Sequence, residues 1–128
     1  MKIINPATGT VVRELETDSA TAVRKKYRRA REGQRPWARE PLRRRLNAIA
    51  RFRERIVAEH ETLAATLTEE VGKPISQSRN ELNGLLTRID FFIAESAKAL
   101  HEQKVHADAG QNMDERITHE PLGVIANI

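Results

Sequence analysis

The sequence contains no cysteine. Within its 128 residues, this absence excludes disulfides, thiolate metal sites and a cysteine nucleophile. Aromatic residues make up only 4% of the chain, so a core has to be built from Leu, Ile, Val and Ala. No apolar run approaches the roughly 20 residues that a membrane-spanning helix needs, and the start, MKIINPATG, lacks the apolar stretch of a signal peptide. We therefore expect a cytoplasmic protein with no membrane partner.

Charge, by contrast, is abundant: 31% of the residues are charged, and the formal net charge is +4. The excess of positive charge is concentrated at Arg24, Lys25, Lys26, Arg28, Arg29 and Arg31, and again at Arg43, Arg44 and Arg45. Such a run can contact phosphates, but Glu32, Glu40 and Glu54 lie nearby and only Tyr27 and Trp37 are available for base stacking. A solvated helix face is the favoured interpretation, and a nucleic-acid partner is disfavoured.

Turn residues and apolar periodicity predict a hairpin followed by helices. Residues 2–15 place β-forming pairs on either side of an Asn-Pro-Ala-Thr-Gly turn, which is typical of a β-hairpin. A helix should follow, with its cap among residues 17–19, and Gly33 and Pro36 should end it.

Two further helices are expected. Aliphatic residues recur at three- and four-residue steps over residues 41–72, which predicts one long helix ended by Gly72. A third helix should begin at Ser76 or Ser78 and end near residue 101.

The last part of the sequence favours one or two strands over residues 116–119 and 122–128. The final one is apolar on both faces, as in the interior of a sheet. The predicted fold class is mainly α with short β segments: an N-terminal hairpin over 1–16, three helices over 17–101, and strands over 102–128. Because few elements remain to cover both faces of a sheet, we expect a fragment whose last strands enter a sheet outside it.

No complete active site emerges from these residues, and we predict neither catalytic residues nor metal ligands. No two histidines have metal-ligand spacing on one helix. Gly72 and Lys73 lack the remainder of the phosphate-loop pattern. His60, which falls on an apolar helical stripe, is interpreted as a partly buried packing residue with a hydrogen bond.

One helical face is unusually small and polar. Asn80, Asn83, Gly84 and Thr87 share this face at helical spacing. A mid-helix glycine costs about 1 kcal/mol against alanine, and it can mark the close approach of a backbone, a helix or a ligand. The alternative interpretation is an exposed polar face with a tolerated glycine.

Six motifs follow one another along the chain: NPATG (5–9), PWARE (36–40), LRRRLNAIARFRERI (42–56), EEVGKPISQSRNEL (69–82), DFFIAESA (90–97) and EPLGVIANI (120–128). In this order and spacing they resemble the N-terminal quarter of the NAD(P)-dependent aldehyde dehydrogenase superfamily. The family more often has Thr at the position of Val71, before its Gly-Lys-Pro.

This resemblance implies part of an α/β fold with an incomplete cofactor-binding domain. In the family, a cysteine thiolate attacks the aldehyde, hydride passes to NAD or NADP, and a Glu-activated water releases a carboxylic acid. The groups that do this are not found here. The fragment should therefore be inactive alone and should bind neither cofactor tightly.

The resemblance also implies roles for four residues. Ile128 matches an apolar position that lies against the cofactor in relatives. Asn80, Asn83 and Gly84 match the wall of the aldehyde entrance tunnel, where Gly84 would leave room for a bulky aldehyde.

Two other functions stay open. The chain could be a basic helical module that binds an acidic partner chain or nucleic acid, with affinity that falls steeply with salt. It could also be an assembly element that associates through unpaired strands. Because unpaired strand edges promote association, we expect a homo-oligomer, independently of how the complete enzyme assembles.

Overall fold

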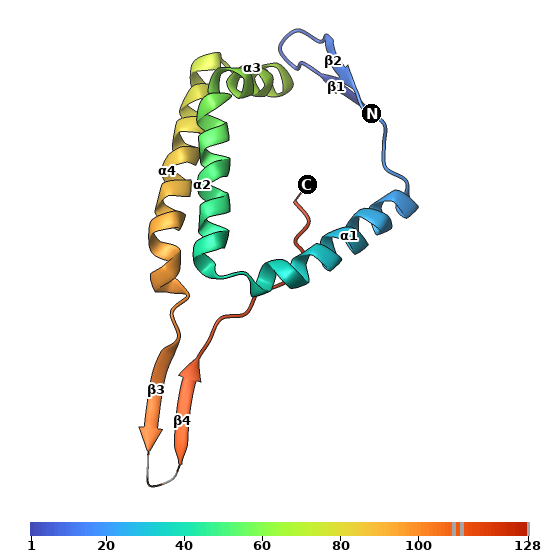
Figure 1. Ribbon diagram of the computed structural model, residues 1–128. Helices are drawn as coiled ribbons and strands as arrows, with labels where there is room; N and C mark the ends of the chain where they lie inside the picture. Colours follow the sequence, from blue (N-terminus) through green and yellow to red (C-terminus); the bar gives the residue numbers. More distant parts are fainter. Residues whose placement is uncertain (109, 111, 128) are drawn as a thin grey trace.

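The computed structural model describes residues 1–108, 110 and 112–127, and within them helices predominate (Figure 1). The helices are α1 (Ala20–Arg39), α2 (Leu42–Ala58), α3 (His60–Val71) and α4 (Ile75–Ala99). The strands are β1 (Lys2–Ile4), β2 (Val11–Glu14), β3 (Gln103–Asp108) and β4 (Met113–Ile117). β1 pairs antiparallel with β2, and β3 with β4, which makes two separate hairpins. The expected class, mainly α with short strands, is confirmed.

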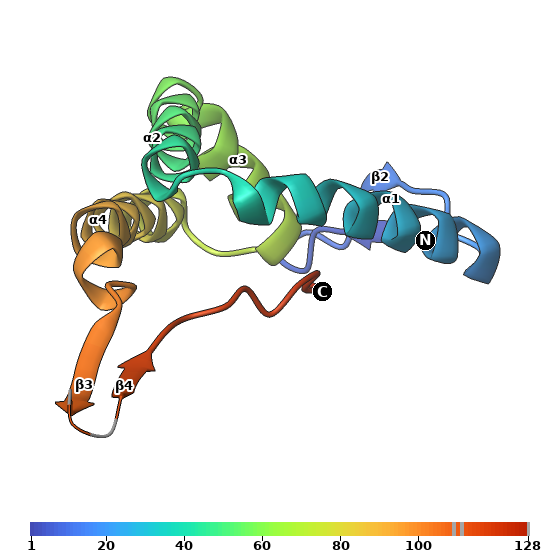
Figure 2. The same ribbon diagram turned by 60° about the horizontal axis from the view of Figure 1, so that its bottom comes forward.

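The helices α2 and α4 lie side by side, and α3 packs against α4 at one end of this pair (Figures 1 and 2). The buried apolar side chains at these contacts are Ile56, Ala64, Leu82 and Ile89. Ser78 is also fully buried, and its hydroxyl lies 2.8 Å from the hydroxyl of Thr68. Since a buried hydroxyl needs a hydrogen-bond partner, this contact sets the position of α4 against α3.

The predicted end of the first helix is wrong. Ser19 caps α1 through its side chain, as expected, but the helix continues through Gly33 and Pro36 to Arg39. Proline removes one backbone donor and leaves a carbonyl without its helical partner. No residue of α1 is buried, so water can satisfy that carbonyl, and neither residue ends the helix.

The predicted long helix over residues 41–72 is two helices instead. The break falls at Glu59, whose φ of −106° and ψ of 13° leave the helical region. The N–H of Glu59 still donates to Arg55, and its carbonyl accepts from Leu63, so the chain bends with most of its hydrogen bonds kept. The bend directs α3 across α4, where Ala64 is fully buried. Because residues 58–60 include neither Gly nor Pro, only this packing distinguishes the bend from a straight helix.

Gly72 ends α3 as predicted, in the left-handed conformation with φ of 73°. The first hairpin lies close to it, because a Cβ at Gly72 would be 2.6 Å from Cγ of Pro6. The glycine therefore serves both the helix end and the approach of the β1–β2 turn.

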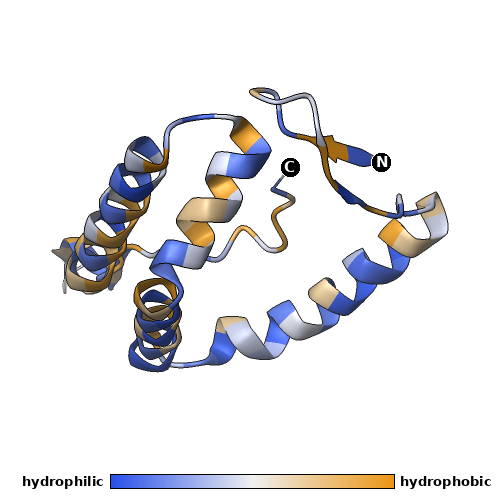
Figure 3. Ribbon diagram, turned by 90° about the horizontal axis from the view of Figure 1, so that it is seen from above, coloured by the Kyte–Doolittle hydropathy of each residue, from blue (hydrophilic) through white to orange (hydrophobic). Residues whose placement is uncertain are grey.

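The expected strand at 122–128 is not formed over residues 122–127, and residue 128 lies outside the described residues. Leu122 is 93% exposed and Ile125 is 74% exposed. Seen from above, this C-terminal segment runs into the opening between α1 and α3 (Figure 3). An apolar segment becomes a strand only where a neighbouring strand completes its hydrogen bonds, and no described strand lies beside this one.

Gly72→Ala should lower the free energy of unfolding by about 1–2 kcal/mol, because alanine disfavours the left-handed conformation and its Cβ would meet Pro6. Chemical unfolding followed by far-ultraviolet circular dichroism measures this change. Gly33→Ala is the matched control, since a Cβ there meets no atom within 4 Å and alanine favours a helix interior. Equal stabilities of wild type and Gly72→Ala would contradict the prediction.

Candidate functional site

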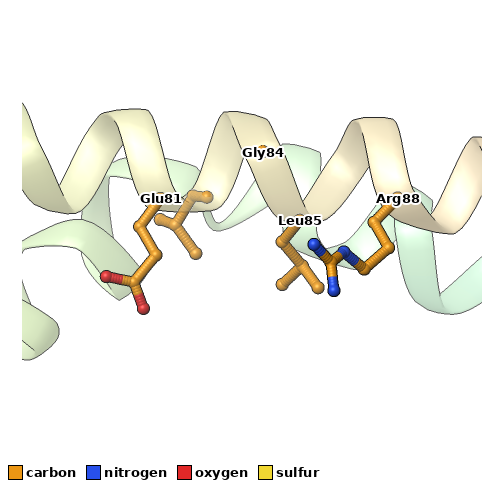
Figure 4. A pocket seen from close by; sticks show the side chains of 5 residues that line it. Glu81, Gly84, Leu85 and Arg88 are labelled. Atoms are coloured by element: carbon orange, nitrogen blue, oxygen red, sulfur yellow. The ribbon is translucent and has the colours of Figure 1, made fainter.

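The candidate site is one face of α4, centred on Gly84. Two adjoining hollows meet there. The first, of about 480 Å³, is lined by Glu81, Leu82, Gly84, Leu85 and Arg88 (Figure 4). The second, of about 390 Å³, is lined by Gly84, Thr87, Arg88, Phe91 and Phe92.

Gly84 lines both hollows. A Cβ at Gly84 would meet no atom within 4 Å, so no packing contact in the described residues requires a glycine there. The position is open, as it is at Gly33, and what distinguishes Gly84 is its place in the lining of both hollows. Thr87 lines the second hollow beside it, as the shared helical face predicted.

The two asparagines of the predicted face are placed differently. Oδ1 of Asn83 lies 3.2 Å from Nε2 of His60, so this side chain faces α3. Asn80 is exposed and lines neither hollow. Of the three predicted tunnel residues, Gly84 is the one that lies in the hollows.

His60 belongs to a polar network between α3 and α4. It is half-buried, as expected, and its Nδ1 lies 3.3 Å from Oε1 of Glu61. Arg79 donates to both carboxylate oxygens of Glu61, at distances from 2.7 to 3.1 Å. These hydrogen bonds from Arg79, and then the one with His60, hold the pKa of the Glu61 carboxyl below its ordinary value of 4.5.

Ion pairs also join α4 to its other neighbours. Arg53 of α2 donates to both oxygens of Asp90, at 2.5 and 2.8 Å, and this contact raises the pKa of the guanidinium. Lys73 pairs with Glu81 beside the first hollow. Two parallel hydrogen bonds, such as those from Arg53 to Asp90, fix the orientation of both side chains in addition to the attraction between their charges.

The remaining predictions have different outcomes. Ile128, the predicted cofactor contact, lies outside the described residues. Within 1–108, 110 and 112–127, no three His, Cys, Asp or Glu side chains are grouped as metal ligands. In the same residues, no helix combines the length and apolarity that a membrane crossing requires.

Two features were not predicted as sites. A hollow of about 280 Å³ lies where α1, α2 and the C-terminal segment approach one another, lined in part by Arg45, His119 and Glu120. Nε of Arg45 is buried there without a hydrogen-bond partner in the described structure. No sequence pattern indicates this meeting of residues 45 and 119, because it depends on how the C-terminal segment returns to the helices.

The second feature is a row of arginines on α1. It consists of Arg24, Arg28, Arg31, Arg35 and Arg39, which recur at three- and four-residue steps and are all exposed. Among the described acidic residues, only Asp18 pairs with a cation of α1, and that cation is Lys26. The predicted solvated basic face is therefore present, and its charge is largely uncompensated.

Comparison with known proteins gives the same family along the whole sequence. The family model for the aldehyde dehydrogenase family matches residues 1–128. Over 128 residues the sequence is 30% identical to 3,6-anhydro-alpha-L-galactose dehydrogenase of Streptomyces coelicolor, covering 100% of this chain and 25% of that protein. The chain thus spans about a quarter of the length of this relative.

Solved structures show the fold. A putative aldehyde dehydrogenase from Bacillus subtilis superposes with a TM-score of 0.84 at 18% identity, covering 95% of this chain and 27% of that chain. A succinic semialdehyde dehydrogenase from Streptococcus pyogenes, in complex with NADP+, gives a TM-score of 0.77 at 16% identity, covering 84% and 24%.

The network around Glu61 predicts a pH-dependent stability. A carboxyl whose pKa is lower in the folded state stabilises the fold above its unfolded pKa, and this contribution is lost as the pH falls through the folded pKa. Glu61→Gln should therefore lower the melting temperature near neutral pH, and its difference from wild type should shrink as the pH falls from about 5 to about 3. Thermal unfolding across this pH range measures it.

Glu69→Gln is the matched control, since Glu69 is an exposed residue of the same helix. A difference between Glu61→Gln and wild type that stays constant with pH would contradict the prediction.

Proposed function

The chain belongs to the aldehyde dehydrogenase family, and we propose that it is the N-terminal part of an NAD(P)-dependent enzyme that oxidises an aldehyde to a carboxylic acid. The observation that carries this proposal is the family match over all 128 residues, at about a quarter of the length of the relative. The open hollows around Gly84 support it, because they lie on the predicted tunnel face.

The described residues do not fit a dinucleotide by themselves. A pyrophosphate is held by free backbone N–H groups of a glycine-rich turn at a helix N-terminus. Gly72 precedes α4, but Pro6 lies where a Cβ on this glycine would be, so the first hairpin closes that approach. The proposal therefore assigns NAD or NADP to the complete enzyme, and no tight cofactor binding and no catalytic residue to this chain.

What this chain contributes is a wall of the substrate passage. In the proposal, α4 is held from behind by α2 and α3 and presents the Gly84 face to the aldehyde. Asn83 acts indirectly, because its contact with His60 ties the α4 face to α3. Asn80 shares the predicted helical face by its spacing but lines neither hollow. Apolar walls at Leu85, Phe91 and Phe92 would exclude water from the substrate.

An activity comparison tests this proposal. The polypeptide encoded by the complete reading frame should reduce NAD+ or NADP+ in the presence of an aldehyde, whereas the 128-residue chain alone should not. Formation of the reduced nicotinamide is followed by its absorbance. If the 128-residue chain turned over an aldehyde by itself, or if the complete polypeptide oxidised none, the proposal would be wrong.

Gly84→Leu in the complete polypeptide should raise KM for long aldehydes by roughly tenfold and leave the shortest nearly unchanged. The reason is that a leucine side chain would project into the hollows, where a Cβ meets nothing within 4 Å. Kinetics over an aldehyde chain-length series measure this. Gly33→Leu, on the exposed helix α1, is the matched control, and parallel behaviour of the two variants would argue against a tunnel wall at Gly84.

The row of arginines on α1 supports a second candidate function, the binding of a polyanion such as nucleic acid. Five cations in line would release about as many counterions on binding a duplex, so the logarithm of the affinity should fall with the logarithm of salt concentration at a slope of about −4. Fluorescence anisotropy with a labelled duplex at several salt concentrations measures this slope. If no binding were seen at low salt, the second candidate function would be wrong, and the arginines of α1 would be no more than a solvated helix face.

Two broader expectations belong to the same proposal. The exposed apolar residues Leu122 and Ile125 support self-association of the isolated chain, which stays a prediction, as does the homo-oligomer expected of the enzyme. A cytoplasmic location also stays a prediction.

A further inference from the structure

Arg88 stands where the two hollows on α4 meet. Arg88 and Gly84 are the two residues that line both hollows. Figure 4 shows its guanidinium beside Leu85, at the opposite end of the first hollow from Glu81. The side chain is therefore part of the candidate site and not of the packed side of α4.

No acidic residue neutralises Arg88 from its own helix. The positions three and four residues away are Gly84, Leu85, Phe91 and Phe92, and these are the positions that face a helical side chain.

Three acidic residues are nearest in sequence, and the structure gives partners to two of them. Glu81 pairs with Lys73, and Asp90 accepts two hydrogen bonds from Arg53. Glu95, on the same helix, lies seven positions from Arg88, as far as Glu81 does, which is about two helical turns and beyond the neighbouring positions of a helical face. Among the described residues, then, no carboxylate forms an ion pair with Arg88, and the positive charge is open to a ligand.

The surroundings of this charge suit an anion that enters along apolar walls. A guanidinium offers parallel N–H donors that match carboxylate, sulfonate or phosphate oxygens. Leu85, Phe91 and Phe92 line the hollows around it and are exposed. A bound substrate that covers these apolar side chains would exclude water from the guanidinium and so strengthen such a contact. A neutral alkyl chain would use the same walls but would leave the guanidinium without a partner.

We propose that Arg88 binds the anionic end of the aldehyde, so that the preferred substrates carry a carboxylate, sulfonate or phosphate at the end away from the carbonyl group. This inference rests on the proposed function and deepens it, because it gives the substrate class of the same site. In this proposal, the absence of a side chain at Gly84 leaves space for the substrate, and Arg88 selects substrates with a negatively charged end.

The test compares an anionic aldehyde with a neutral one of the same shape. Succinic semialdehyde and its amide, 4-oxobutanamide, differ at the distal group alone. In the complete polypeptide, Arg88→Met should lower kcat/KM for succinic semialdehyde about tenfold to hundredfold, the range expected when a charged hydrogen-bonding partner is lost. The value for 4-oxobutanamide should change less than about twofold.

Two further variants separate recognition from a structural effect. Arg88→Lys keeps the charge but not the planar donor pair, and should recover part of the preference for the anion. Arg51→Met removes an exposed arginine of α2 and should leave both substrates unaffected. Inhibition by succinate gives a readout of binding without turnover, and Arg88→Met should weaken it by a similar factor.

The outcomes are distinguishable. Equal losses for both substrates in Arg88→Met, or no loss for either, would overturn the role of Arg88 while leaving the aldehyde dehydrogenase activity in place. A complete wild-type polypeptide that oxidises neither these aldehydes nor any other would overturn the proposed function itself, and this inference with it.

Discussion

The one-sided burial of α4 is the constraint on which the other features depend. Ser78, Leu82 and Ile89 are its buried residues, and they recur at helical spacing along one stripe. This stripe packs against α2 and α3, and the hydroxyl pair of Ser78 with Thr68 adds a directional contact. Because a straight helix can pack only one side on these neighbours, the side that carries Gly84 stays open.

Ion pairs reinforce the same division of α4 into a packed and an open side. Asp90 is held by α2 through Arg53, and Arg79 is held by α3 through Glu61. These surface pairs contribute little stability individually, but they engage the charges next to the packed side. Within the part of the chain that the structure describes, Arg88 has no such partner, and the chemical character of the open side follows from that difference.

The remaining elements are attached to this helical centre more loosely. The two hairpins form separate sheets, and α1 has no buried residue. The C-terminal segment exposes Leu122 and Ile125. A core of a few aliphatic side chains is small for a chain of 128 residues. This character agrees with the proposal that the chain is part of a larger enzyme, in which residues outside it would complete these apolar faces.

The sequence by itself determined the local elements that depend on backbone chemistry, and the family. The turn residues of the first hairpin, the Ser19 cap and the left-handed Gly72 act within a few residues, so their patterns were sufficient. Only the tertiary structure decided the bend at Glu59, the continuation of α1 past Pro36, and the lack of a strand at residues 122–127. Each of these depends on whether a distant segment or water meets the backbone. The same holds for the site: helical spacing placed Gly84 and Thr87 on one face, but only the packing of α3 assigned Asn83 to His60 and left Arg88 beside the hollows.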